Sequence, residues 1–177
     1  MRRILLAIGA LFFLGTSVHA EMKCAPGKCG GSMKSDTKQE AKYILKANSS
    51  YQAIDIKAKE YRCSQCKMFV KKLDYATQAV KQNGDTYFFD DIGCMVKWLK
   101  NDVKDIVKMY VKSLDTHRWI EVQKAHYSRI APSPMGYGFA ALEKEKEGLI
   151  SFEEVKTYIL NDETLRNPAV KKQLLGE

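Results

Sequence analysis

The stretch NGDTYFFDDIGCMVKWL, residues 83–99, holds the strongest fold signals in the chain. Asn83-Gly84 is typical of a tight turn, and the aromatic run at residues 86–89 predicts a strand directly after it. Asp90 and Asp91 are good N-cap residues, so they predict the start of a helix. The apolar residues that follow fall on one helical face: Ile92, Met95, Val96 and Leu99. A strand that leads into a capped, amphipathic helix is therefore expected here.

Weaker patterns outside this stretch predict further short elements. Apolar runs predict strands at residues 68–70, 106–111, 119–122 and 139–142. Residues 131–138 contain two prolines and two glycines, which neither a helix nor a regular strand accommodates. Beyond this turn, Ser151 and Glu154 have capping-box spacing and predict a helix that runs to Leu160.

The order of turn, phenylalanine-containing strand and capped helix occurs twice, once after Gly84 and once after Gly138. We interpret this as a weak internal duplication of a strand-strand-helix-strand unit. The expected fold class is α+β, with two similar small lobes. With 177 residues and 45% hydrophobic content, the chain is large enough to bury one ordinary core.

The N-terminus, residues 1–20, is typical of a secretory signal peptide. Two arginines precede an apolar run at residues 4–14, and a small-residue site predicts cleavage after Ala20. The apolar run is shorter than the roughly 20 residues of a membrane-spanning helix. Residues 21–23 do not form a lipobox before Cys24, so we expect a soluble exported protein, which in a Gram-negative source is periplasmic.

The formal net charge is +8, from 29 Lys and Arg residues against 21 Asp and Glu residues. The basic residues are spread along the chain and form no aromatic-interleaved block, so nucleic acid is not an expected partner. We interpret the charge as a mildly basic docking face. A monomer is expected, with membrane contact only through docking to membrane partners.

A short sulfur-rich motif, Cys63-Ser64-Gln65-Cys66-Lys67-Met68, places two thiols and a thioether within six residues. Soft sulfur ligands at this density favour a soft metal, above all Cu(I). The alternative is structural, with the two cysteines in a small disulfide and Met68 filling a core gap. The chain has five cysteines, and an odd number in an exported protein leaves at least one thiol unpaired.

Cys94 lies in the first turn of the predicted helix. Free N–H groups and the positive end of the helix dipole favour its thiolate, although the charges of Asp90 and Asp91 partly oppose this effect. If the helix start packs against the first strand, Cys94 completes a site with Cys66. The alternative is that Cys94 is a small buried hydrophobe.

Residues 21–59 are expected to form a flexible tail and linker. Cys24, Cys29 and Met33 give its first part soft ligands, while glycine and proline disfavour packed secondary structure there. We interpret these three residues as candidate tail ligands for a metal. A small disulfide between Cys24 and Cys29 is the alternative.

Four motifs, in order along the chain, resemble the NosL family of exported copper-binding accessory proteins for nitrous oxide reductase. They are Cys66-Lys67-Met68, residues 89–95 (FDDIGCM), Trp119-Ile120 with Ala125 and Tyr127, and residues 133–138 (SPMGYG). The resemblance covers roughly residues 63–160. It implies two homologous lobes, a fold related to the organomercurial lyase core, and one sulfur-bound Cu(I) that is delivered to the copper centres of nitrous oxide reductase.

The resemblance also implies metal ligands. By position, the Cys-x-Met element of the family corresponds to Cys66 and Met68, and its Pro-Met-Gly turn corresponds to Met135. To these we add Cys63 and Cys94 from the sequence pattern.

The same resemblance implies domain boundaries. A NosL-like domain is expected at residues 60–162, with lobes at about 60–112 and 113–162, and a C-terminal extension at 163–177. Two features depart from the family: its members are often lipoproteins, and the cysteine-containing tail lies outside the family core.

The leading prediction is therefore a periplasmic Cu(I) metallochaperone without catalytic turnover, with nitrous oxide reductase and its copper-centre assembly machinery as partners. The second class is a thiol-disulfide oxidoreductase that uses Cys63 and Cys66. Such motifs usually open a helix after a strand, whereas the residues after Cys66 look more like a strand. Two further alternatives remain: a mercury-handling enzyme, suggested by the implied relation to the organomercurial lyase core, and a non-catalytic adaptor module.

Overall fold

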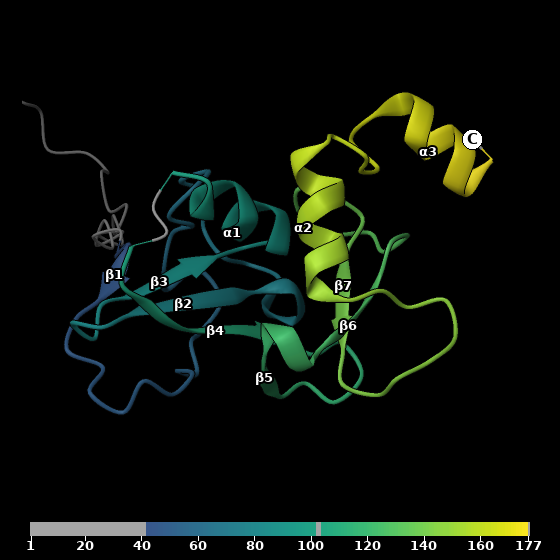
Figure 1. Cartoon of the computed structure of the whole chain (residues 1–177). Coiled ribbons are helices and arrows are strands. Elements are labelled where there is room, and N and C mark those ends of the chain that lie inside the picture. Colours follow the sequence, from purple (N-terminus) through teal and green to yellow (C-terminus); the bar gives the residue numbers. More distant parts are fainter. Residues whose placement is uncertain (1–41, 102–103, 177) are drawn as a thin grey trace, which may run out of the picture. The chain divides into compact units, whose positions relative to one another are not determined.

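The computed structural model describes residues 42–101 and 104–176 (Figure 1). Within these ranges, five antiparallel strands form one sheet in the order β1-β3-β2-β4-β5. These strands are β1 (Ile44–Leu45), β2 (Thr77–Lys81), β3 (Thr86–Phe89), β4 (Ile106–Lys112) and β5 (Trp119–Glu121). A second sheet pairs β6 (His126–Ser128) with β7 (Ala140–Leu142), and the helices are α1 (Ile92–Leu99), α2 (Phe152–Leu160) and α3 (Pro168–Leu175). The mixed fold with antiparallel sheets and three helices confirms the expected class.

The β2–β3 hairpin turns at Asn83-Gly84, as the sequence predicts. Gly84 has a φ of +80°, and a Cβ at this position would lie 2.9 Å from the backbone nitrogen of Asn48. Both the backbone conformation and the available space therefore require glycine here.

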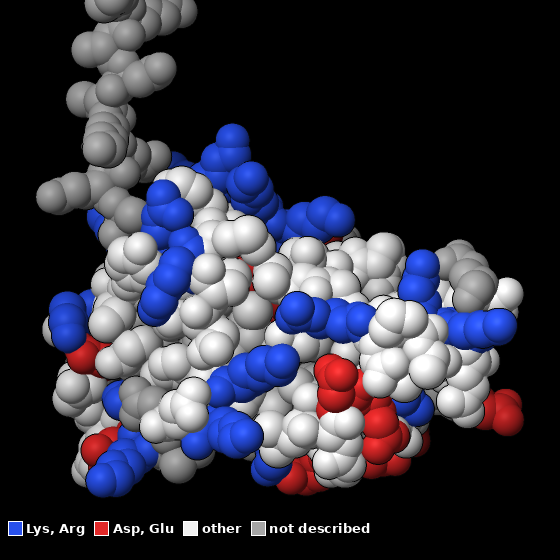
Figure 2. All heavy atoms as spheres, turned by 90° about the horizontal axis from the view of Figure 1, so that it is seen from above, with Lys and Arg blue, Asp and Glu red and all other residues white. Residues whose placement is uncertain are grey.

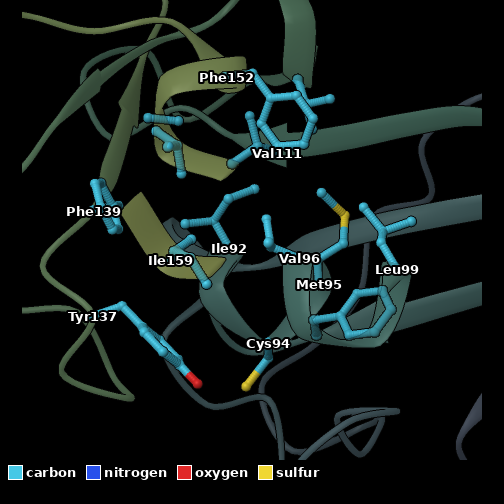
Figure 3. Close-up of a cluster of buried hydrophobic side chains, with 14 of the residues drawn as sticks. Ile92, Cys94, Met95, Val96, Leu99, Val111, Tyr137, Phe139, Phe152 and Ile159 are labelled. Atoms are coloured by element: carbon cyan, nitrogen blue, oxygen red, sulfur yellow. The ribbon is translucent and has the colours of Figure 1, made fainter. Parts of the chain in front are cut away.

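Helix α1 begins at its predicted cap, because Asp91 accepts a hydrogen bond from the Gly93 N–H at 2.8 Å. Its predicted apolar face is buried in the main core (Figure 3): Ile92, Met95, Val96 and Leu99. Helix α2 adds Phe152, Val155 and Ile159 to the same core, which also contains residues of β2, β3 and β4. One core thus joins the two helices to the larger sheet.

The second half of the chain differs from the expected duplicate lobe. The strand-strand-helix-strand order holds for β2, β3, α1 and β4, and the Ser151 capping box starts α2 as expected. Within the described residues, however, α2 is followed by α3 rather than by a strand. Strand β5, which lies beyond the expected lobe boundary at residue 113, pairs with β4 in the first sheet. The second half therefore shares the core and the sheet of the first half, since β5 covers the edge that β4 would otherwise expose.

Residues 42–59 belong to the folded part of the chain, which corrects the expectation of a linker there. Strand β1 pairs with β3, and the buried Asn48 donates from Nδ2 to Thr86 Oγ1 at 3.1 Å. The side chain of Gln78, on β2, binds both backbone polar groups of Ile54 at 3.0 and 2.6 Å. Sequence periodicity missed this segment because only Ile44–Leu45 form a strand, whereas side-chain amides and turn hydrogen bonds satisfy much of the remaining backbone.

Several expectations concern residues outside the described ranges: the signal peptide at 1–20 and the tail ligands Cys24, Cys29 and Met33. In the described part of the chain, no helix combines the length and apolarity needed to cross a membrane. The C-terminal extension contains α3, and the segment before it contacts the Pro-Met-Gly turn, because the Leu165 N–H donates to the Tyr137 carbonyl at 3.2 Å.

Candidate metal centre

The Cys63–Met68 segment forms a tight loop, and the strand expected at residues 68–70 is reduced to an isolated bridge at Phe69. The Cys63 N–H donates to the Met68 carbonyl at 2.7 Å, and the Lys67 N–H donates to the Cys63 carbonyl at 3.0 Å. Lys67 has a φ of +68°, which closes the turn, and Phe69 makes only an isolated bridge to Arg62. This local geometry turns both thiols of the motif inward, and the Cys66 N–H points at Cys63 Sγ at 3.4 Å.

The other half of the site comes from the junction of β3 and α1. The Ser64 N–H donates to the Phe88 carbonyl at 2.8 Å, which attaches the cysteine loop to the end of β3. Asp91 caps α1, and Cys94 lies in the first turn, as predicted. Because Asp91 serves as the cap, the preceding Asp90 is free to face the loop.

Four side chains meet where the loop and the helix start come together. The ligand atoms of Cys63, Cys66, Asp90 and Cys94 all lie within 4.8 Å of one another. The three cysteines are free thiols, and Cys66 S–H donates to Asp90 at 3.5 Å. Cys63, Cys94 and Asp90 are buried, whereas Cys66 is partly exposed.

The spacing of this cluster fits a metal ion bound by sulfur. Two sulfurs that share a metal at about 2.3 Å are about 3.8 Å apart in tetrahedral geometry and about 4.6 Å apart in linear geometry. A spread of at most 4.8 Å therefore admits one ion with small side-chain movements. Thiolates bind soft or borderline ions, so the donor set suits Cu(I) or Zn²⁺ and not Mg²⁺ or Ca²⁺.

The three thiols differ in pKa. A hydrogen bond from Cys94 lowers the pKa of Cys63 to about 7, despite the burial of its sulfur. The same hydrogen bond, together with burial, raises the pKa of Cys94. Burial raises the pKa of Cys66 to about 12. Cys94 is therefore the donor to Cys63, and its raised pKa opposes the effect that the helix dipole is expected to have on this thiol.

Asp90 is the site residue that sequence reasoning missed. The sequence suggested it only as a helix cap, a role that Asp91 takes. The available signal was that two adjacent aspartates precede the helix, while one side chain suffices to cap it. Its carboxylate is buried against Cys66, where it supplies an acceptor and a negative charge beside the thiols.

The two predicted thioether ligands lie close to this region in different ways. Met68 is 48% exposed and borders a hollow of about 450 Å³ that also reaches Asp90. Met135 is partly buried, and its N–H donates to the Asp91 carboxylate at 3.1 Å, which attaches the Pro-Met-Gly turn to the start of α1. Both methionines remain predicted ligands.

Tyr137 packs over the helix start next to Cys94 (Figure 3). A Cβ on Gly93 would lie 2.1 Å from Cδ2 of the Tyr137 ring, so the ring lies directly on the glycine. The Tyr137 hydroxyl accepts a hydrogen bond from Arg166 Nη1 at 3.0 Å. The residues before α3 thereby hold this ring against the start of α1.

No protein-family model matches the chain, and no curated protein matches its sequence. Among solved structures, the crystal structure of the copper chaperone NosL from Shewanella denitrificans is similar to it, with a TM-score of 0.45 and 14% sequence identity. The similarity covers 62% of this chain and 85% of that one. The chemistry of the site rests on the thiol and carboxylate cluster described above.

Proposed function

We propose that this protein is a metallochaperone that binds Cu(I) through Cys63, Cys66 and Cys94. The observation that carries the proposal is that thiols from two separate segments converge to within 4.8 Å in a largely buried cluster. Burial and mutual repulsion oppose the ionisation of the three thiols to thiolates when no cation is bound. A soft cation would stabilise all three at once.

The same cluster supports transfer of the ion rather than its permanent storage. Cys66 is partly exposed, while Cys63 and Cys94 are buried. An incoming thiolate can therefore displace Cys66 first, while the two buried sulfurs still hold the ion. We further propose Met68 and Met135 as neutral ligands that assist this exchange, since a thioether leaves Cu(I) more readily than a thiolate.

The acceptor in our proposal is nitrous oxide reductase, together with its copper-centre assembly machinery, and transfer takes place in the periplasm after export. These assignments follow from the four-motif sequence resemblance and from the signal-peptide pattern of residues 1–20. They are separable from metal binding, because a Cu(I) site of this kind serves any copper enzyme that offers soft ligands.

The geometry is less suited to a thiol-disulfide oxidoreductase. Such enzymes need an exposed thiol of low pKa as the nucleophile. Here the thiol with the lowered pKa, Cys63, is fully buried, and the accessible Cys66 has a raised pKa. The Cys63–Cys66 pair also lies in a turn and does not open a helix.

An anaerobic titration of the reduced protein with Cu(I) against a chromophoric chelator tests the proposal. We expect one tightly bound ion per chain. Cys66→Ser should weaken the affinity by about 100-fold or more, since loss of even an outer hydrogen-bond partner of a ligand costs about 10- to 100-fold.

A Cys24→Ser/Cys29→Ser variant is the matched control for thiols outside the cluster and should keep the tight site. If Cys66→Ser retains the wild-type circular dichroism and also binds Cu(I) with unchanged affinity, the chaperone assignment is wrong and an adaptor role is favoured. A parallel titration with Zn²⁺ should show weaker competition than Cu(I).

A further inference from the structure

A hollow that opens to solvent beside the proposed metal site is rich in basic side chains. The hollow above Asp90 is lined by three basic residues and one acidic residue, together with apolar and small side chains: Arg62, Lys71, Lys72, Asp90, Met68, Phe69, Ser133 and Pro134. Asp90 is buried and accepts from Cys66, so its carboxylate faces the thiols. The charge presented to solvent at this opening is therefore positive.

The basic side chains are not neutralised by neighbours. In the described ranges, no acidic side chain forms an ion pair with Lys71 or Lys72, and both residues are exposed. Arg62 is held in place, since its guanidinium lies 3.9 Å from the centre of the Phe69 ring and Nη1 donates to the Lys67 carbonyl at 2.9 Å. On the face drawn in Figure 2, Lys and Arg are widely spread, and Asp and Glu appear in smaller groups, mostly along its lower half.

The centre of the same opening is apolar. Met68 is 48% exposed, and Phe69 and Pro134 are partly buried beside it. An apolar centre with a charged rim is the usual composition of a transient protein interface. The hollow also reaches the residue that touches the exposed metal ligand Cys66, so a partner seated there would be next to the ion.

We propose that this opening is a docking surface for an acidic protein surface that carries its own thiolate metal ligands. This proposal rests on the proposed Cu(I) function and adds the chemistry of the partner. The rim residues Arg62, Lys71 and Lys72 attract the partner and orient it, and Met68 and Pro134 contact it. Opposite charge mainly accelerates association and fixes orientation, so the effect is on transfer rate and not on Cu(I) affinity.

Two synthetic acceptor peptides of equal length test the proposal. Each carries one Cys-x-x-Cys pair, flanked by glutamates in one peptide and by lysines in the other. Each also bears a fluorophore that bound Cu(I) quenches. The full protein is loaded with Cu(I) and mixed with each peptide. At about 20 mM salt we expect transfer to the glutamate peptide to be about tenfold faster, and at about 500 mM salt the two rates should converge.

Two charge-reversal variants of equal net charge separate the docking surface from a general effect of charge. Lys71→Glu/Lys72→Glu should abolish the preference for the glutamate peptide, with Cu(I) affinity unchanged. Lys144→Glu/Lys146→Glu, on an exposed segment away from the hollow, should retain it.

Three results would overturn the docking proposal. The first is an equal transfer rate to both peptides at low salt, and the second is an equal loss of preference in both variants. The third is that the protein binds anionic phosphatidylglycerol vesicles while it transfers Cu(I) to both peptides at the same rate, which would favour a membrane surface as the partner. If Cu(I) affinity is intact in each of these cases, the metal site stands and only the docking surface is wrong. Absence of Cu(I) binding overturns both proposals.

Discussion

Substituting Gly93 with alanine tests how closely helix α1 packs against Tyr137, which follows the Pro-Met-Gly turn. The added methyl carbon would lie 2.1 to 2.5 Å from three atoms of the Tyr137 ring, whereas ordinary contacts begin at 3.4 Å. The ring must therefore move by about 1.3 Å, the difference between 3.4 and 2.1 Å. Tyr137 is only 3% exposed and is hydrogen-bonded to Arg166, so it has little room to move.

The expected magnitude follows from two opposing effects. Overpacking of a core costs about 1–3 kcal/mol, and a shift of this size in a buried ring places Gly93→Ala at the upper end. Alanine in place of glycine within a helix returns about 1 kcal/mol. We therefore expect a net loss of about 2 kcal/mol in the free energy of unfolding, measured by urea denaturation followed by circular dichroism.

A double-mutant cycle with Tyr137→Ala provides the control. Without the ring, the new methyl group enters the vacated space, so Gly93→Ala should be neutral or stabilising by up to about 1 kcal/mol in that background. Gly93→Ala should also weaken Cu(I) binding, because Cys94 is the next residue and moves with the helix start. A wild-type or higher stability for Gly93→Ala in the presence of Tyr137 would refute the packing described here.

Three further predictions concern charge, ligation and an independent helix cap. Burial raises the pKa of Asp91 from 3.8 to about 6, so the folded state binds this proton more tightly than the unfolded state. Relative to Asp91→Asn, wild-type stability should therefore rise by up to about 3 kcal/mol as pH falls from 8 to 4; a pH-independent difference would contradict this. Cu(I) affinity should weaken as the pH is lowered, because the thiols must lose their protons to bind the metal. Calorimetry in two buffers should show that Cys94→Ser releases one proton fewer per bound ion than the wild type. An unchanged proton count would exclude Cys94 as a ligand. Ser151→Ala should cost about 1 kcal/mol through the lost N-cap of α2 while leaving Cu(I) affinity unchanged, and weakened binding would show that α2 stability and the site are coupled.

Local signals predicted the central part of the fold well. The turn at Asn83-Gly84, the strand after it, and the helix capped by Asp91 all depend on interactions between residues close in sequence. The capping box at Ser151 is local in the same sense. Such elements can be predicted because the turn residues and helix caps report the backbone conformation that they stabilise.

Contacts between distant segments were not predictable in the same way. The packing of residues 42–59 depends on the amide of Gln78, and the position of β5 depends on the free edge of β4. Neither interaction leaves a periodic pattern in the sequence. The first depends on the single side chain of Gln78, and the second depends on which of the two sheets β5 joins. The expected second lobe was wrong in its first strand for this reason, because β5 joins the sheet of the first half. Within the described residues it also lacks the expected last strand, since α3 follows α2.

The sequence alone determined which thiols this protein has: five cysteines, with two in the Cys63–Cys66 motif and Cys94 in the first turn of a capped helix. Residue types and local geometry carry that information. Only the tertiary structure decided that the loop packs against the helix start, that Asp90 joins the thiols, and that Cys66 is the exposed member. These outcomes depend on burial and on distances between segments far apart in the chain, which are set when the core around α1 forms and not by any one segment.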